Sequence, residues 1–237
     1  DQVGSADLLV ENGADVGAID DRGRNALSYA AESGSLPIAE MLIDFGARID
    51  LQDDRGMSPL MHAASEGHDL VMVRLLEAKA NPSLRDDDGR TVLFYAVDSG
   101  DYRTVDLLLE QGVDVNATAD DGTMPIQYAL ESNQADILEL LLRSGADPTI
   151  RGARNRTLLM IAAANGNDEG VRLLVRAAPF LLNTQDRDGW TAILYALRKS
   201  ADERSGLNSS ATTLLRAGAR VDADGDPAAA VAHAAAR

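Results

Sequence analysis

The chain has 237 residues, of which 45% are hydrophobic but only 4% aromatic, so we expect a core of aliphatic side chains. Its formal net charge of −16 argues against nucleic acid as a partner, because the phosphate backbone attracts positive surfaces. The absence of cysteine excludes disulfides, thiolate metal ligands and a thiol nucleophile. No apolar run approaches the roughly 20 residues that span a bilayer, so no membrane insertion is expected.

Glycines recur every 33 residues in the first copies and after 34 and 36 residues in the last two, which is the signature of a repeat architecture. The first series, in which Asn replaces one glycine, is Gly23, Gly56, Gly89, Gly122, Asn155, Gly189 and Gly225. A second series lies 11 residues behind it, at Gly34, Gly67, Gly100, Asn133, Gly166 and Ser200. A third series is expected to end the second helix of several copies in a left-handed conformation, at Gly46, Gly112 and Gly145.

A short helix is predicted between the first two series of each copy. Its start carries residues whose side-chain oxygen caps a helix, namely Asn25, Ser58, Thr91, Thr157 and Thr191. A second helix with a V/I-x-x-L-L seam follows, as at residues 71–76 and 137–141. Each helix is too short to be stable alone, so stacking of neighbouring copies must supply the stability.

The stretch DDRGMSPLMHAASEGHDLVMVRLLEAKA and its counterparts from residues 86 and 121 resemble ankyrin repeats, with the pattern D-x-x-G-x-T-P-L-H-x-A-A. This resemblance implies an all-α solenoid of helix-turn-helix units with β-hairpin-like finger loops, forming a single domain over residues 1–237. It implies a non-enzymatic protein-binding role without naming a partner. The expected boundaries are a partial repeat at 1–19, full repeats at 20–52, 53–85, 86–118, 119–151, 152–185 and 186–222, and a truncated copy at 223–237.

Two departures from the repeat lie in the C-terminal third. The fifth repeat breaks its closing loop at residues 178–182, and the sixth inserts about six residues around 201–207 between its helices. These irregularities indicate either a specific function or drift near the end of the array.

Catalysis is not predicted. The histidines do not form a cluster that the sequence can identify, since His62 and His68 lie in one repeat and His233 at the chain end, and no G-x-S-x-G elbow, P-loop or H-E-x-x-H motif is present. No carboxylate has a partner at a spacing that implies acid–base work. We therefore expect no enzyme activity, no cofactor and no metal.

An acidic column is the first candidate binding feature. Asp20, Asp53 and Asp86 favour the finger turn by bonding their own backbone. The turn does not require the next column, which consists of Asp21, Asp54, Asp87 and Asp120. Equivalent residues of stacked repeats lie about 10 Å apart, and their summed field attracts a cationic surface. A solvated acidic face without a partner and a divalent ion between neighbouring Asp pairs are the alternatives.

An aromatic column is the second candidate feature. One repeat position holds Tyr29, His62, Tyr95, Tyr128 and Tyr195. These side chains either face the concave groove as interface anchors or pack on the neighbouring helix. The next helical turn adds the charged residues Glu32, Glu66, Asp98, Glu131, Arg198 and Lys199. Trp190 follows a finger glycine, where a tryptophan is hard to bury, so partner contact is favoured.

The sequence therefore predicts a module that binds a protein with a basic patch through its finger tips and groove. Inhibition of a basic enzyme or toxin is one concrete form of this function. The alternative is an interaction arm of a larger protein whose active domain lies outside this chain. The free chain is expected to be a soluble monomer, with the cytoplasm as its favoured location.

Overall fold

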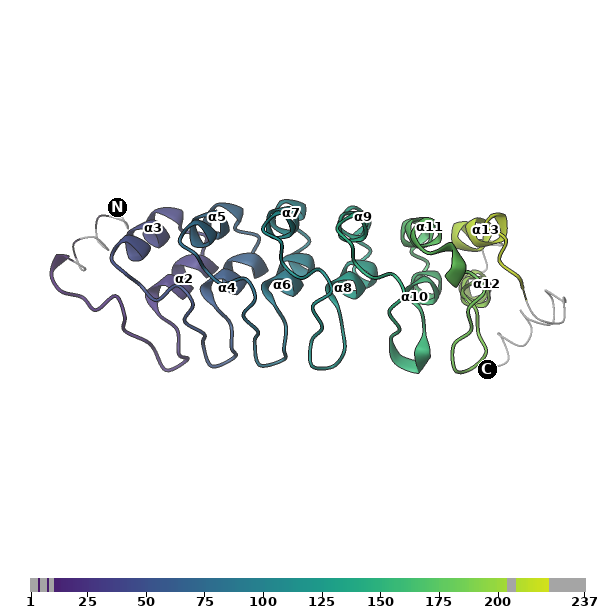
Figure 1. Cartoon of the computed structure of the whole chain (residues 1–237), viewed down its shortest axis with the longest axis horizontal. Helices are drawn as coiled ribbons and strands as arrows, with labels where there is room; N and C mark the ends of the chain where they lie inside the picture. Colours follow the sequence, from purple (N-terminus) through teal and green to yellow (C-terminus); the bar gives the residue numbers. More distant parts are fainter. Residues whose placement is uncertain (1–3, 5–7, 9–10, 204–207, 222–237) are drawn as a thin grey trace. The chain divides into compact units, whose positions relative to one another are not determined.

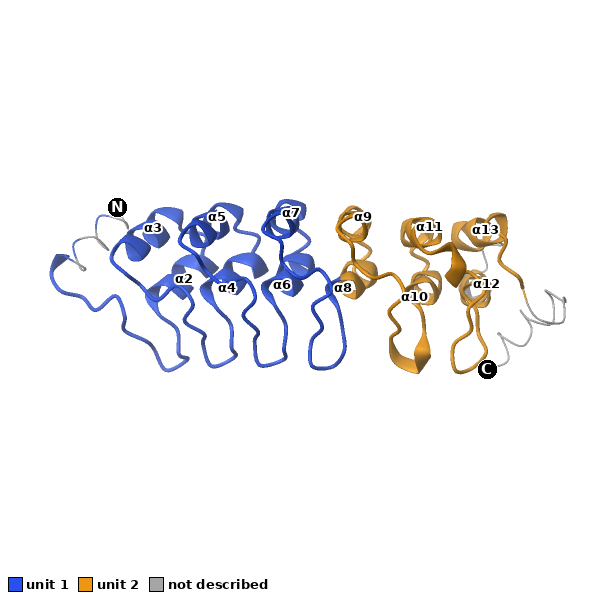
Figure 2. Ribbon diagram, in the orientation of Figure 1, with its two compact units in different colours: residues 1–125 blue, residues 126–237 orange. Residues whose placement is uncertain are grey.

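The structure is a computed structural model that describes residues 4, 8, 11–203 and 208–221. Regular structure in this part of the chain is helical, with one isolated bridge between Arg151 and Thr157, so the predicted all-α class is confirmed (Figure 1). The chain forms two compact units, residues 1–125 and 126–237, which Figure 2 colours separately. A single domain over residues 1–237 stays a prediction.

From residue 12 onward, the first unit contains three helix pairs, α2 (Ala26–Glu32) with α3 (Leu36–Asp44), α4 (Pro59–Ser65) with α5 (Asp69–Glu77), and α6 (Val92–Ser99) with α7 (Tyr102–Glu110). The second unit contains α8 (Pro125–Glu131), which begins at the last residue of the first unit, followed by α9 (Ala135–Arg143), η1 (Ala153–Asn155), α10 (Leu158–Asn165), α11 (Asp168–Ala177), η2 (Pro179–Leu181), α12 (Ala192–Glu203) and α13 (Ser209–Arg216).

Stacking of equivalent helices buries the core of each unit. In the first unit, α2, α4 and α6 lie side by side in one layer, and α3, α5 and α7 form a second layer (Figure 1). Leu27, Leu60 and Leu93 occupy the same repeat position and are each at most 1% exposed. Because a short helix alone cannot bury such a side chain, each copy depends on its neighbours.

Helix caps follow the sequence at most of the predicted positions. Asn25, Ser58 and Thr157 accept the N–H of the third helical residue, at 2.9, 3.3 and 3.3 Å. Each such cap contributes about 1 kcal/mol. Thr91 makes no side-chain cap bond, and the buried Oγ1 of Thr191 has no hydrogen-bond partner, so the prediction that their side chains cap a helix is wrong.

The finger glycines allow both a left-handed main chain and a close approach of the next finger. Gly56 has φ 74°, and a Cβ atom built there would lie 2.7 Å from the amide nitrogen of Asp87 in the next finger. Asn155 takes the left-handed conformation expected of a glycine substitute, with φ 63°. Ser200 does not, because it lies inside α12, and its assignment to the second glycine series is wrong.

The C-terminal irregularities have a structural counterpart. The broken loop at residues 178–182 contains η2, which leaves Phe180 71% exposed while Leu181 and Leu182 are buried. The first residues of the predicted insertion, 201–203, extend α12, and residues 204–207 lie outside the described part. The truncated copy at 223–237 and most of the partial repeat at 1–19 also lie outside it. None of the described helices is long and apolar enough to cross a membrane.

Replacing Lys79 by Gly is expected to stabilise the chain by about 1 kcal/mol, because a side chain in the left-handed region costs that much. Lys79 ends α5 with φ 70°, in the place where other copies have glycine. The urea midpoint should rise with an unchanged slope. Lys79→Ala keeps the Cβ atom and is the matched control, and an equal gain in both variants would contradict the argument.

Candidate functional site

One carboxylate organises each typical finger turn. Asp53 Oδ1 accepts the N–H groups of Arg55 and Met57 at 2.9 and 3.0 Å. Asp20, Asp86 and Asp186 bond their own turns in the same way. The prediction that this Asp column is structural is confirmed for these four copies.

The second oxygen of the same carboxylate holds the aromatic column. Asp20 Oδ2 accepts the Tyr29 hydroxyl at 2.5 Å, and Asp186 Oδ2 accepts the Tyr195 hydroxyl at 2.6 Å. The second and third copies use the same bond, with His62 Nε2 3.0 Å from Asp53 Oδ2 and the Tyr95 hydroxyl donating to Asp86. The fourth copy has Ala119 and the fifth has Gly152 where the first, second, third and sixth copies have Asp, so Tyr128 lacks this carboxylate. In the copies that contain Asp20, Asp53, Asp86 and Asp186, the residue of the aromatic column therefore links the short helix to its finger turn.

Burial removes three predicted contact residues from the surface. Trp190 is 9% exposed, Tyr195 6% and His62 2%. The expectation that a tryptophan at the finger is hard to bury is wrong, because its ring packs on Tyr195 with centroids 5.0 Å apart and lies under the Arg198 guanidinium at 5.8 Å. Tyr29 is 42% exposed, whereas Tyr95 and Tyr128 are half-buried.

The buried hydrogen bonds change the acidity of their members. Burial and the Asp186 carboxylate raise the pKa of Tyr195 to about 12. Burial, assisted by Arg24, lowers the pKa of His62, although Asp53 acts in the opposite direction. Burial also opposes ionisation of Asp53, but the N–H groups of its turn and His62 lower the pKa of this carboxyl overall. His62 therefore favours its neutral form in the folded chain.

The adjacent acidic column lies outside this network. Asp21, Asp54, Asp87 and Asp120 are all exposed. Their main chain links successive fingers, since the N–H groups of the last three donate to the carbonyls of Arg22, Arg55 and Asp88 at 2.9, 3.1 and 2.9 Å. This ladder of main-chain bonds, which sequence reasoning missed, fixes the spacing of the exposed carboxylates.

A cavity of about 510 Å³ lies between the fingers and short helices of the second and third copies. Its lining includes Glu66, Asp87, His62 and Tyr95. Glu32 also lines it but already pairs with Arg24, with an N–O distance of 2.7 Å. Glu66, together with the predicted Asp98 and Glu131, is exposed. The structure thus brings Glu66 and Asp87 to one cavity and leaves Glu32 neutralised.

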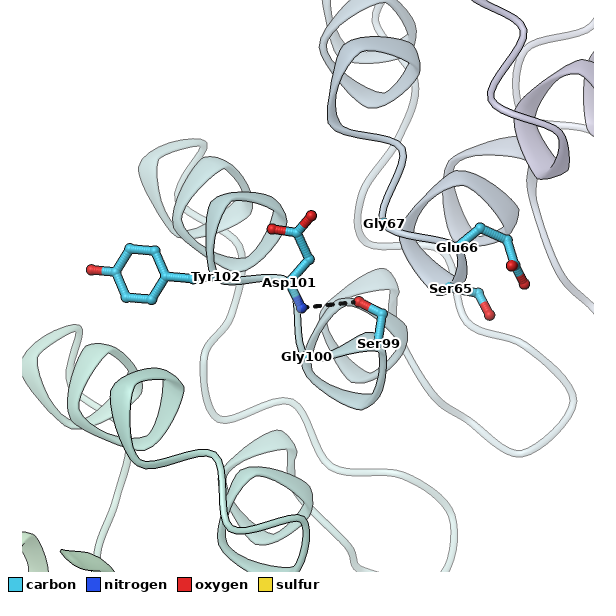
Figure 3. Close-up of a pocket in the computed structure, with 7 residues that line it drawn as sticks. All are labelled: Ser65, Glu66, Gly67, Ser99, Gly100, Asp101 and Tyr102. Atoms are coloured by element: carbon cyan, nitrogen blue, oxygen red, sulfur yellow. Dashed lines mark hydrogen bonds between the residues drawn. The ribbon is translucent and has the colours of Figure 1, made fainter.

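A second cavity, of about 550 Å³, lies between the turns that precede α5 and α7. Figure 3 shows Glu66 on one side and Asp101 on the other, with the Tyr102 ring directed away from Glu66. The Asp101 N–H donates to Ser99 Oγ at 3.4 Å. Glu66 therefore lines both of these cavities.

Basic side chains gather in the second unit, where the predicted Arg198 is exposed and Lys199 half-buried. Arg198 lines a cavity of about 180 Å³ with Arg154 and Arg156, which sequence reasoning did not single out. The change of sign at Arg187 in the acidic column was the signal that could have directed attention to these fingers. In the described segments, no group of three or more His, Asp or Glu residues could hold a metal ion.

A family model described as ankyrin repeats, in three copies, matches residues 2–86, 70–152 and 128–225. The chain belongs to the ankyrin-repeat family. The crystal structure of the human ASB11 ankyrin repeat domain matches with a TM-score of 0.78 and 22% identity, covering 91% of this chain and 93% of that chain. At this identity the likeness shows the fold alone. The curated proteins contain no match to the chain. Ankyrin repeats are generally non-enzymatic protein-interaction modules, and no catalytic family is indicated.

Replacing Tyr95 by Phe removes the hydroxyl that donates to the buried Asp86 carboxylate. A hydrogen bond to a charged group contributes about 1.5–3 kcal/mol, so unfolding free energy should fall by this amount. Tyr29→Phe breaks the same bond at an exposed site and should cost less, because water replaces the lost donor. Denaturant titration compares the two variants, and equal losses would contradict a role for burial.

Replacing His62 by Tyr should reduce the loss of stability in mild acid. The folded-state pKa of His62 is lowered, so its contribution is fully present above the unfolded value of about 6.5 and is lost as pH falls below it. Tyrosine, which other copies use, keeps the bond to Asp53 and does not titrate there. Between pH 7.5 and pH 5.5, the free energy of unfolding should fall more in the wild type than in the His62→Tyr variant. Equal decreases in the two proteins would contradict this assignment.

Proposed function

We propose that the chain binds a protein partner with a basic patch, through the exposed acidic column and groove of residues 1–125. The observation that carries this proposal is the ladder of Asp21, Asp54, Asp87 and Asp120, whose carboxylates are exposed on fingers joined by main-chain bonds. No ion pair found among the described residues involves these four side chains. Their charge is therefore available to a partner.

Electrostatics favours association over a purely solvated role for the column. Neighbouring copies are separated by about 10 Å, close to one Debye length at physiological salt, so mutual repulsion is mild. A partner cation placed between two fingers gains from both carboxylates. Such complementarity acts mainly on the association rate.

Fewer aromatic side chains are accessible to a partner than the sequence predicted. Tyr29 presents 42% of its surface, and Tyr95 and Tyr128 are half-buried, so these three remain candidate anchors. His62 and Tyr195 support the fingers from within. Glu66 and Asp98 extend the acidic surface beside the short helices. Covering the basic surface of an enzyme or toxin would be one concrete form of this function.

The test reverses Asp54, Asp87 and Asp120 to Lys and measures association with the partner recovered by affinity capture at low salt. The association rate should fall by about tenfold or more, because the steering field changes sign. Capture should also weaken as salt rises.

A charge-matched control reverses Glu77, Glu110 and Glu139, which are exposed on α5, α7 and α9. This variant has the same net charge but keeps the finger column, so its association rate should change by no more than about threefold. If association slowed equally in both variants, the effect would come from net charge and not from the finger column. An acidic or salt-insensitive partner would overturn the proposal.

A further inference from the structure

An arginine–aromatic pocket lies in the second unit. It is the cavity of about 180 Å³ lined by Arg154, Arg156, Asp188, Trp190, Tyr195 and Arg198. Three guanidinium groups and one exposed carboxylate line it, so its lining is net positive in an otherwise acidic chain. All six residues belong to the described part of one unit.

Aromatic rings hold two of the arginines in place. The Arg156 guanidinium lies over the Tyr195 ring at 4.9 Å, and Arg198 lies over the Trp190 ring at 5.8 Å. The two rings also contact each other, and Tyr195 is fixed by its bond to Asp186. Stacking leaves the planar edge of a guanidinium free to donate, so these groups are arranged before any ligand arrives.

Hydrogen-bonding capacity remains unused in the pocket. Arg156 Nε is buried without a hydrogen-bond partner and lies 3.9 Å from Asp186 Oδ2, beyond hydrogen-bond range. Asp186 is already satisfied by the N–H groups of Asp188 and Trp190 and by the Tyr195 hydroxyl. The Arg156 side chain is 36% exposed and pairs with Asp186 only at this long distance, so an entering anion can reach the guanidinium and accept from its remaining donors.

The third arginine shows which anion suits the site. Arg154 pairs with the Asp188 carboxylate at 3.1 Å, and both side chains are substantially exposed. Arg154 also takes a left-handed conformation, with φ 59°, in addition to Asn155 at the position where the other fingers have their left-handed glycine. A carboxylate is therefore already accepted at one edge of the pocket, where an exposed pair contributes little and can be exchanged.

We propose that this arginine–aromatic pocket binds the carboxylate of an acidic side chain on a protein partner. The inference rests on the protein-binding function proposed above and adds a second, oppositely charged contact. The cavity holds about six water volumes, which matches the end of a Glu or Asp side chain. Arg156 and Arg198 would donate to the carboxylate in the bidentate geometry that guanidinium favours, and Arg154 would exchange Asp188 for it.

The experiment uses the full chain and a labelled hexaglutamate peptide blocked at both ends, with hexaglutamine as its neutral control. Binding is followed by anisotropy at physiological salt and by the emission of Trp190, the chain's single tryptophan. Hexaglutamate should bind saturably and alter this emission, whereas hexaglutamine should not.

Two substitutions should act in opposite directions. Arg198→Gln should weaken hexaglutamate binding by about tenfold, the effect of one charge-assisted contact. Asp188→Asn should tighten it by several fold, because Arg154 loses its internal carboxylate. Arg187→Gln is the matched control. Arg187 is exposed on the same finger as Asp188 but lies outside the cavity lining, so its replacement should change the affinity for hexaglutamate by less than about twofold.

Several outcomes would overturn the proposal. They are the absence of saturable binding, equal losses in Arg198→Gln and Arg187→Gln, or no tightening in Asp188→Asn. Displacement of the peptide by inorganic phosphate at lower concentrations than by acetate would assign the pocket to phosphate instead. This assay needs no partner and leaves the Asp54 column unchanged, so its failure is separate from a failure of the basic-partner proposal.

Discussion

The fold depends on a shared carboxylate in each typical finger. One oxygen closes the turn by accepting two main-chain N–H groups, and the other accepts a Tyr or His from the short helix. Because both partners of the carboxylate are fixed by it, turn and helix hold each other in place. Charge-assisted bonds of this kind are stronger than neutral ones, and stacking of the copies shields those of His62 and Tyr195 from water.

This constraint decides which residues remain available for binding. In four copies, the aromatic residue uses its polar atom in a hydrogen bond to the finger carboxylate. Stacking also buries His62, Tyr195 and Trp190. The neighbouring carboxylates, such as Asp54, make their ordered contacts through the main chain and leave their side chains in solvent. The structural column and the column proposed to bind a partner therefore lie one residue apart in the sequence.

The two compact units offer opposite chemistry. The first presents exposed carboxylates on regular fingers, and the second presents arginines supported by aromatic rings. The difference arises from few changes, since Ala153 and Arg187 replace Asp in the exposed column, whereas Arg154 and Arg156 have counterparts at Arg22 and Arg24 of the first finger. A repeat architecture tolerates such changes because each finger's surface contributes little to the stacked core.

The sequence by itself determined the repeat, its turns and the all-α class, because glycine spacing, caps and apolar seams are local signals that each copy repeats. It also identified the exposed acidic column, since the turn chemistry accounts for Asp53 but not for Asp54. Only the tertiary structure decided that Tyr95 bonds Asp86, that Trp190 is buried, and that Arg154, Arg156 and Arg198 line one pocket. These contacts join residues from different elements, and the pocket joins two different repeats, so a pattern within one copy cannot specify them.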